Sequence, residues 1–427
     1  MSPAAPGESR AMRNVALTLL FASVWINYID RGNLAVAAPV LAPALGLGPA
    51  QMGVLFSAFF WTYALFQIAS GWVADRYDVN RVYATGFFLW SAATLLTGFT
   101  SSLSGLLALR MMLGMSESVA YPCYARILAR YYPEHKRGLA NALIDVGTKA
   151  GPALGTFAGA RIIAHYGWRA MFFGMGVVSL AWLVPWLLVA PRTFYWPKRT
   201  ISSLRGPGFQ AILTKRPAWV TFCGLFCFNY AFYFLLSWLP SYLVNERRFS
   251  LADMAFYGAM PFCATAVASL AAGWFSDFLT RRGADPGIVR RNGAAAGLLV
   301  CGIALPISTT ANHMIAMSAL VIAFVAIGVF TCYVWAITQR LAGPEAAGTW
   351  TGLQNAIGNM GGVVAPIATG YIVKATGSFF LAFIAASIFL LIAAAIYAFG
   401  LGRVQPVVWG NHCNDYATNH PPKNPIY

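Results

Sequence analysis

Residues 71–75, Gly-Trp-Val-Ala-Asp, recur as residues 273–277, Gly-Trp-Phe-Ser-Asp, 202 positions further along the chain. A second pair, Pro-Glu at residues 133–134 and again at 344–345, repeats at a similar distance of 211 positions. Each copy stands beside a long apolar run, at the same place within its half of the chain. One short match carries little weight, but two matches in the same order indicate an internal duplication. The pattern therefore predicts two parallel repeats of one structural unit.

The composition excludes most soluble folds. Of 427 residues, 59% are apolar and 10% are charged, whereas about 25% are charged in an ordinary soluble protein. So little charge cannot cover so much apolar surface. The net charge of +16 would fit a protein that binds nucleic acid, but the basic residues form short clusters between long apolar runs. This arrangement predicts an integral membrane protein instead.

Twelve apolar segments are long enough to cross a bilayer, which takes about 20 mainly apolar residues. They cover residues 14–38, 51–73, 81–99, 103–128, 138–163, 169–190, 217–243, 252–276, 290–309, 313–338, 348–374 and 379–401. Because backbone polar groups in lipid must be paired internally, each segment is predicted to be a helix. We therefore predict an all-α membrane protein with twelve transmembrane helices in two pseudo-symmetric six-helix bundles.

The predicted domain bounds follow from this pattern. Residues 1–190 form the N-terminal bundle, residues 191–216 a cytoplasmic linker, and residues 217–403 the C-terminal bundle. Residues 404–427 are rich in Asn and Pro, and we expect a disordered tail. Of the 29 Lys and Arg residues, 21 fall in one set of loops, 5 in the other and 3 inside spans. Positively charged loops stay in the cytoplasm, so both termini are predicted to be cytoplasmic.

Charge inside the spans is rare and confined to the first half. Six ionisable residues fall there: Asp30, Arg31, Arg110, Glu117, Asp145 and Lys149. A lone charge at the centre of a transmembrane helix costs about 2.5–3.5 kcal/mol, so these groups must pair, line water or change protonation. The repeat places no ionisable residue at the matching positions of the second half. We infer that any ion coupling resides in the first half.

Arg110 and Glu117 lie seven residues apart, which is about two helical turns on one face. That distance is too long for a salt bridge within the helix, so each is available to a ligand or another helix. A guanidinium can bind a carboxylate through two hydrogen bonds, which makes Arg110 a candidate anion clamp. Burial favours the protonated form of a carboxyl, which makes Glu117 a candidate proton carrier. The alternative is that both belong to structural ion pairs.

Two further pairs of charges have a spacing that limits their roles. Asp30 and Arg31 are adjacent and point about 100° apart, so one can face a cavity while the other meets a neighbouring helix. Asp145 and Lys149 are four residues apart and can neutralise each other. Alternatively, Thr148 and Lys149 place an extra cation beside the cavity, which would suit a second substrate carboxylate.

Several motifs resemble those of the major facilitator superfamily. Residues 71–81, Gly-Trp-Val-Ala-Asp-Arg-Tyr-Asp-Val-Asn-Arg, are similar to that superfamily's loop motif between helices 2 and 3, except that Asp78 stands where Gly is usual. Residues 27–33, Asn-Tyr-Ile-Asp-Arg-Gly-Asn, resemble the anion:cation symporter family more narrowly. So do Arg110-x6-Glu117 and residues 238–242, Trp-Leu-Pro-Ser-Tyr. That family includes sugar-acid carriers for galactonate and hexuronates, the vesicular glutamate transporters and sialin.

The resemblance implies roles for individual residues. Asp30 and Glu117 would be proton-coupling sites, and Arg31 would be a partner of Asp30 or a second anion contact. Tyr63, Trp335 and Asn355 fall where the family places binding residues. The full set of candidate substrate-binding residues is Arg31, Tyr63, Arg110, Thr148, Lys149, Tyr230, Trp335, Gln354 and Asn355. The candidate gate residues are Asp75, Arg76 and Asp277. The alternatives are hydrogen bonding between helices for the polar groups and inert surface charge for the gate.

These observations predict a secondary active transporter for proton-coupled symport of an organic anion, a sugar acid or another carboxylate, by alternating access. The alternatives are an exchanger or facilitator not driven by protons, or a carrier of aromatic or dicarboxylic acids. The sequence holds no nucleotide-binding P-loop, zinc-hydrolase or serine-hydrolase motif, so we predict no enzyme activity. We expect a monomer in the bacterial inner membrane, with protons and an anion as partners and no cofactor, metal or nucleic acid.

Overall fold

The computed structural model of the chain describes residues 10–131, 134–193 and 207–409. In chain order the elements are α1 (Arg10–Ala44), α2 (Pro49–Arg76), α3 (Val79–Thr97), α4 (Leu103–Glu117), α5 (Ala120–Tyr131), α6 (Glu134–Thr193), α7 (Phe209–Leu213), α8 (Arg216–Ser241), η1 (Tyr242–Glu246), α9 (Leu251–Arg281), α10 (Pro286–Ile307), α11 (His313–Thr376), α12 (Phe380–Ala395) and η2 (Ile396–Gly400). η1 and η2 are π-helical turns. Every element within these ranges is helical, which confirms the prediction of an all-α chain.

The two longest helices are each interrupted by a glycine. α6 breaks at Gly167, whose φ is 82°, and α11 breaks at Gly343, whose φ is 68°. Positive φ favours glycine because a Cβ would clash with the backbone. Each break separates two predicted spans, so the helical ranges match the predicted ones. Among the described residues, seven segments meet the length and apolarity needed to cross a membrane, and the count of twelve crossings stays a prediction.

Asp78, the residue that departs from the family's loop motif, begins a helix. Its carboxylate accepts hydrogen bonds from the backbone N–H groups of Asn80 (2.8 Å) and Arg81 (3.1 Å) at the start of α3. The first N–H groups of a helix have no partner within it, and an aspartate side chain satisfies them. The departure from glycine therefore supplies a helix cap rather than disrupting the turn.

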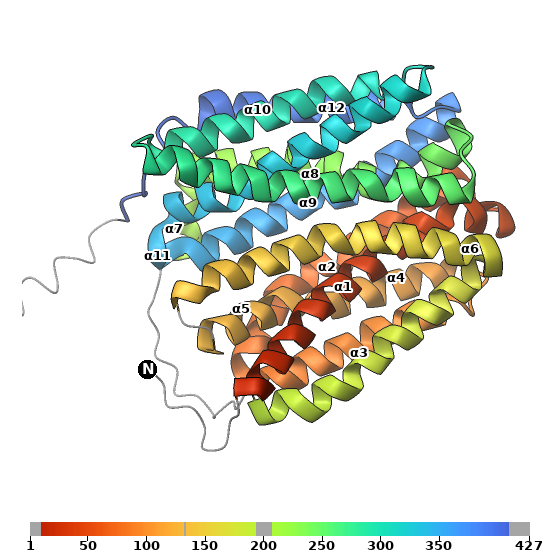
Figure 1. The fold of residues 1–427 in the computed structure, drawn as a ribbon, viewed down its shortest axis with the longest axis horizontal. Coiled ribbons are helices and arrows are strands. Elements are labelled where there is room, and N and C mark those ends of the chain that lie inside the picture. The colour runs from red at the N-terminus through yellow and green to blue at the C-terminus, as the bar shows by residue number, and fades with distance from the viewer. Residues whose placement is uncertain (1–9, 132–133, 194–206, 410–427) are drawn as a thin grey trace, which may run out of the picture.

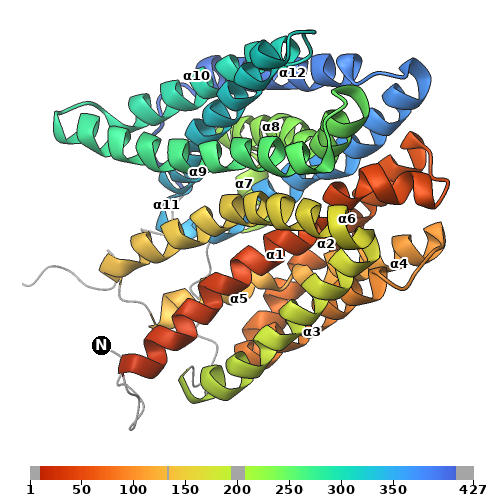
Figure 2. The same cartoon turned by 45° about the vertical axis from the view of Figure 1, so that its right-hand side comes forward.

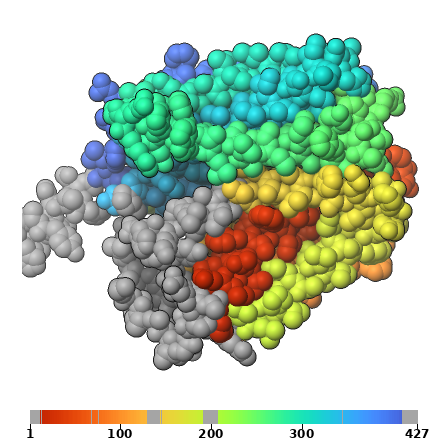
Figure 3. Space-filling model, viewed as in Figure 1, coloured from red at the N-terminus to blue at the C-terminus, as the bar shows by residue number. Residues whose placement is uncertain are grey.

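The helices form two packed groups. Figures 1 and 2 show α1–α6, drawn red to yellow-green, against α8–α12, drawn green to blue. In the space-filling view the two groups meet along one long boundary (Figure 3). The groups touch mainly where α2 meets α11, where α6 meets α9 and where α1 meets α8. This division agrees with two repeats, although the exact bounds of the halves and linker stay a prediction.

The two groups are joined by a hydrogen bond and a ring contact near the turn between α1 and α2, at the end of the bundle opposite Arg10. The Ser57 hydroxyl of α2 donates to the carbonyl of Val363 on α11 at 2.8 Å. The Trp238 ring of α8 meets the edge of Phe56 on α2, with ring centres 5.1 Å apart, while its indole donates to the Pro366 carbonyl of α11 within the second group. A Cβ on Gly53 would lie 2.5 Å from the Pro366 carbonyl oxygen. Only glycine allows the α2 and α11 backbones to approach this closely.

Residues 404–409 pack against the first half of α11, contrary to the prediction of disorder from residue 404. The Val407 N–H donates to the Leu341 carbonyl at 2.8 Å, and the Trp409 indole donates to the Ala342 carbonyl at 3.0 Å. Both carbonyl groups precede the glycine break, where a helix end leaves them without intrahelical donors. The prediction did not consider that Val407 and Trp409 each have an N–H group that can donate a hydrogen bond to this helix end. The rest of the predicted tail lies outside the described residues.

Candidate functional site

The helix that carries Glu117 ends at that residue. α4 stops at Glu117 and α5 begins at Ala120, so the predicted continuous span 103–128 is interrupted. Pro122 explains the interruption, because its ring nitrogen has no hydrogen to donate to the Ser118 carbonyl four residues earlier. The Glu117 carboxyl therefore lies beside the unpaired carbonyl groups of a helix C-terminus, where a positive partner is stabilising.

A buried ion pair joins α1 to α4. Arg31 Nε and Nη2 both donate to Glu117 Oε2, at 3.1 and 2.9 Å. Arg31 is 6% exposed and Glu117 is 0% exposed. The second carboxylate oxygen, Oε1, has no hydrogen-bond partner within the described part of the chain. The resemblance implies that Arg31 pairs with Asp30 or contacts an anion, whereas in the structure Arg31 forms an ion pair with Glu117 on another helix.

Aromatic rings surround the Arg31 guanidinium. The ring centres of Tyr28, Phe59 and Tyr63 each lie 4.8 Å from its central carbon. A guanidinium over an aromatic face is stabilised by the negative charge of the ring face. The Tyr28 hydroxyl also lies 3.0 Å from the Tyr121 hydroxyl of α5. Two polar contacts therefore hold α1 against the interrupted α4–α5 helix, one on each side of the break.

Arg110 and Asp30 lie beside this pair. Arg110 Nη2 is 3.5 Å from the Arg31 carbonyl oxygen, which is a weak contact, and its buried Nε has no hydrogen-bond partner among the described residues. Asp30 accepts hydrogen bonds from the Asn33 amide at 3.2 Å and the Ser179 hydroxyl at 3.3 Å. Asp30 is 2% exposed and Arg110 is 7% exposed. The buried guanidinium thus retains capacity to bind an anion.

The second half of the chain meets the cluster at Tyr233 of α8. Its hydroxyl donates to Asn359 Oδ1 of α11 at 2.7 Å, and its ring centre lies 4.3 Å from that of Phe60 on α2. Tyr233 is also close enough to Arg31 for an electrostatic interaction with the guanidinium. The cluster therefore lies at the boundary between the two helix groups, with its charges on one side and amide and phenol groups on the other.

Two predicted substrate-binding residues lie away from this cluster. Tyr230 stacks on Phe389 of α12, with ring centres 4.1 Å apart. Gln354 is 0% exposed, and its Oε1 accepts a 2.6 Å hydrogen bond from Thr338. Both contacts lie within the second helix group. In this conformation the two side chains stabilise that group and do not face Arg31.

The remaining predicted binding residues differ in how deeply they are buried. Lys149 is buried, whereas Thr148, Trp335 and Asn355 are partly buried. The side chain of Asp145, the predicted partner of Lys149, lies outside the described part of the chain. The choice between a Lys149–Asp145 pair and a substrate contact therefore stays open.

The predicted gate residues lie at the ends of helices. Arg76 sits over the Trp72 ring at 4.4 Å in the last turn of α2, and both residues are exposed. Asp277 is exposed in α9. The side chain of Asp75 lies outside the described residues. Their role at a gate stays a prediction.

Three residues that form the site or hold it in place were not predicted from the sequence. Tyr28 and Phe59 face Arg31, Tyr121 bonds Tyr28, and none of them carries a charge that would mark it in an apolar helix. One signal was available for Tyr28, because it lies three residues before Arg31 and therefore on the same helix face. Phe59 and Tyr121 come from other helices, so only the packing brings them to Arg31.

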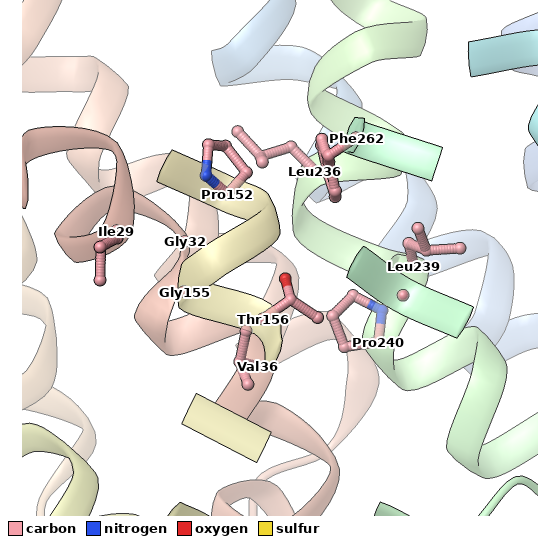
Figure 4. Close-up of a pocket in the computed structure, with 11 residues that line it drawn as sticks. Ile29, Gly32, Val36, Pro152, Gly155, Thr156, Leu236, Leu239, Pro240 and Phe262 are labelled. Atoms are coloured by element: carbon pink, nitrogen blue, oxygen red, sulfur yellow. The ribbon is translucent and has the colours of Figure 1, made fainter. Parts of the chain in front are cut away.

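A hollow between the groups, apart from the charged cluster, is apolar. Figure 4 shows it where α1, α6, α8 and α9 meet, lined mainly by glycine, proline and aliphatic residues together with Phe262. Thr156 supplies the one side-chain hydroxyl among its lining residues. A charged solute would lose its hydration there without gaining partners. This hollow marks a smooth seam between the groups and does not suit an anion.

Comparison with known proteins adds independent findings. The family described as Major Facilitator Superfamily matches residues 20–366. The chain is 31% identical to the D-galactonate transporter of Escherichia coli O6:H1, over 95% of this chain and 99% of that protein. It is 29% identical to a probable galactarate/D-glucarate transporter of Escherichia coli K12, over 92% and 94%. It is 31% identical to a probable sulfoacetate transporter of Cupriavidus necator, over 90% and 92%.

The fold also matches a solved structure. A bacterial homolog of the human lysosomal transporter Spinster, in an inward-facing and unoccupied conformation, superposes with a TM-score of 0.78. The match covers 92% of this chain and 98% of that one, at 21% identity. At that identity the likeness concerns the fold alone. The resemblance inferred from the motifs at residues 71–81 and 27–33 is confirmed by these comparisons.

Proposed function

Because the chain belongs to the Major Facilitator Superfamily, it is a multi-pass membrane transporter and not an enzyme, and we propose that it carries a small organic anion together with protons. The observation that carries this proposal is the buried pair between Arg31 and Glu117. A charged carboxylate of the protein occupies the guanidinium that a substrate carboxylate would need. The protein's own carboxylate and the substrate's therefore compete for one cation.

Protonation of Glu117 resolves this competition. The neutral carboxyl no longer attracts Arg31, and a buried cation without a counter-charge is costly by about 3–5 kcal/mol. A substrate anion that takes the vacated edge of the guanidinium restores the charge balance. Proton binding thus favours anion binding, and release of the anion lets Glu117 lose its proton and pair with Arg31 again. Such linkage is what couples two solutes in one carrier.

Arg110 and Asp30 extend the site. Arg110 has an unpartnered buried nitrogen and supplies a second cationic contact for the anion. Asp30 supplies a second protonation site, held by Asn33 and Ser179. Tyr63 and Tyr233 add phenol groups that can bond substrate hydroxyls from either side of the boundary. Lys149 is buried on α6, and together with Thr148 it would add a cation and a hydroxyl to this set.

The substrate class follows from the site and from the names of the relatives. The relatives are described as carriers of D-galactonate, galactarate or D-glucarate, and sulfoacetate. All of these compounds carry a carboxylate, and some carry two anionic groups. We propose a sugar acid as the leading substrate. The buried Lys149 favours a doubly charged acid as the second candidate, because it would add a third cation to the site.

Transport by alternating access is supported by where the two groups touch. With the termini in the cytoplasm of a bacterial inner membrane, the contacts of Ser57 with α11 and of Phe56 with Trp238 would lie at the periplasmic end. They would close the path on that side, so this conformation would face inward. The halves 1–190 and 217–403 would then rock about the site, with Asp75, Arg76 and Asp277 as contacts of the opposite, cytoplasmic gate.

A transport assay tests the proposal directly. Purified protein is screened by thermal shift with D-galactonate, galactarate and sulfoacetate, and uptake of any binder is measured in proteoliposomes. An imposed inward proton gradient is expected to accelerate uptake. Equal uptake with and without the gradient, for an acid that binds, would show a facilitator or exchanger instead.

Glu117→Gln separates coupling from binding. The amide mimics a permanently protonated carboxyl, so the carrier stays competent for substrate exchange but cannot release the proton. We expect counterflow to persist and gradient-driven uptake to be lost. Glu345→Gln, at an exposed glutamate on the second part of α11, is the control and should leave both activities intact. Retained gradient-driven uptake in Glu117→Gln would contradict the role of Glu117.

A further inference from the structure

A small cavity lies inside the first helix group, apart from the boundary with the second. It is formed between α1, α3, α4 and the second part of α6, which contribute Asp30, Thr94, Arg110 and Phe172 among its lining residues. Ala93, Thr97 and three leucines complete the wall. The Thr97 hydroxyl donates to the Ala93 carbonyl of its own helix, so the charged groups that the cavity meets are those of Asp30 and Arg110, with the Thr94 hydroxyl beside them.

A buried polar atom of a residue that lines this cavity lacks a protein partner. Arg110 Nε has no hydrogen-bond acceptor among the described residues. Arg110 is itself 7% exposed, so bulk water does not satisfy it. An unmet donor on a buried charged group is costly, and native structures supply such a donor with a protein group or an ordered water. The cavity has room on the order of a single water molecule.

The groups that face Asp30 come from every helix packed around it. Arg110 and Glu117 approach from α4, Thr94 from α3, Ser179 from α6 and Asn33 from α1 itself. Arg110 is the positive group in this set and Glu117 the negative one. Thr94 and Ser179 donate hydrogen bonds to the carboxylate. A water in the cavity would meet an N–H donor on one side and a carboxylate and a hydroxyl on the other, which is the number of partners that buried waters typically have.

We propose that this cavity holds one ordered water that links Arg110 Nε to the Asp30 carboxylate. The water accepts from Arg110 and donates to Asp30, so it joins the guanidinium that binds the anion to the second protonation site. The inference rests on the proposed function for its consequence, since it explains how anion binding at Arg110 is sensed at Asp30. When a substrate carboxylate draws the guanidinium away, the water loses a donor and its bond to Asp30 is altered.

Ala93→Val tests the water without touching Asp30 or Arg110. Ala93 is 1% exposed and lines the cavity, so two added methyl groups fill it and exclude the water. The charged form of Asp30 then loses one donor, and the protonated form persists to higher pH. Uptake is measured over a series of external pH values at a fixed pH difference. We expect its midpoint to move to higher pH by about one pH unit, the value of one hydrogen bond to a charged group.

The matched control is Ala92→Val, one residue away on the same helix. Ala92 is not among the residues that line the cavity. It receives the same added volume, so its pH midpoint is expected to equal that of the wild type. Thermal unfolding of both variants checks that each folds.

The water itself can be observed without any transport assay, in a crystal or cryo-EM structure that resolves ordered waters. Density within hydrogen-bond distance of both Arg110 Nε and Asp30 in the wild type, absent in Ala93→Val, is the expected result. An empty cavity in the wild type overturns the proposal even if the chain is a proton symporter. An unshifted midpoint in folded Ala93→Val overturns the link to Asp30. If the water is present but uptake does not depend on the proton gradient, the proposed function is contradicted and the inference about the water is not.

Discussion

Arg31 is bounded by partners on its edges and its faces. Glu117 takes the edge formed by Nε and Nη2, and three aromatic rings lie at 4.8 Å from the central carbon. A planar guanidinium suits this arrangement, because it can stack on rings while its edges form hydrogen bonds. An ammonium group is compact and more strongly hydrated, and it has no edge that binds two oxygens at once. The site is therefore built for arginine and not simply for a positive charge.

Arg31→Lys is expected to weaken substrate binding by roughly tenfold or more, the value of one lost charge-assisted hydrogen bond. Substrate affinity is measured by thermal shift or calorimetry on the purified variant. Arg169→Lys is the matched control, since Arg169 also sits over a ring, that of Trp168 at 4.5 Å, but bonds the Gly98 carbonyl outside the cluster. Equal affinities in Arg31→Lys and the wild type would show that charge alone is needed.

The interrupted helix α4–α5 sets the geometry of the site at the scale of elements. α4 ends at Glu117, and Tyr121 follows in the first turn of α5. Pro122 is tolerated there because the first N–H groups of a helix have no intrahelical acceptor in any case. A continuous helix would turn residues 117 and 121 onto one face in a fixed relation. The break lets the two halves of the helix orient Glu117 toward Arg31 and Tyr121 toward Tyr28 separately.

Pro122→Ala is expected to restore the missing hydrogen bond and extend α4 into α5. Thermal stability should be equal to or above that of the wild type, since alanine is the better helix former by about 3 kcal/mol in a helix interior. Transport should nevertheless slow, because Glu117 and Tyr121 are forced into one register. Pro261→Ala, at a proline inside the continuous helix α9, is the control. Wild-type uptake in Pro122→Ala would show that the break has no part in transport.

At the scale of the whole molecule, the two seams between the helix groups differ in kind. The seam of α2 with α8 and α11 carries a side-chain hydrogen bond from Ser57, the ring contact of Phe56 with Trp238 and a close backbone approach at Gly53. The seam of α6 with α9 is apolar and encloses the hollow of Figure 4. Directional bonds favour one arrangement of two bodies, whereas smooth apolar contact resists sliding little. The first seam is therefore the better candidate for the contact that stabilises this conformation.

Ser57→Ala removes the hydrogen bond that crosses the first seam. A neutral hydrogen bond contributes about 1 kcal/mol, so the population should shift about fivefold toward the state open at the opposite side. The shift is read from the labelling rate of a cysteine placed at Phe56, which is buried in this seam. Ser387→Ala is the matched control, because its hydroxyl bonds the Gly302 carbonyl within the second group. Identical labelling rates in the two variants would show that this contact does not stabilise the closed side.

Much of the architecture could be predicted from periodic and compositional signals. The glycine breaks at 167 and 343 fall between predicted spans, and four of the six predicted charges, Asp30, Arg31, Arg110 and Glu117, lie together in a buried cluster. The interruption after Glu117 was not predicted, although Pro122 marks it, because the apolar run continues through it. The packing of residues 404–409 was missed because so short a segment carries no helical period. Tyr230 and Gln354 were assigned to the site by residue type, but in this conformation their side chains contact residues of the second helix group.

The sequence by itself determined that this chain is a helical membrane protein built of two repeats, with the charges inside its predicted spans in the first. These properties depend on apolar length, charge count and repetition, which are local or additive quantities. Only the tertiary structure decided which charges meet. Arg31 has Asp30 as its neighbour in the chain but Glu117, 86 residues away, as its partner. Adjacent residues on a helix point in different directions, so a side chain's partner is chosen by the helix it faces and not by its place in the chain.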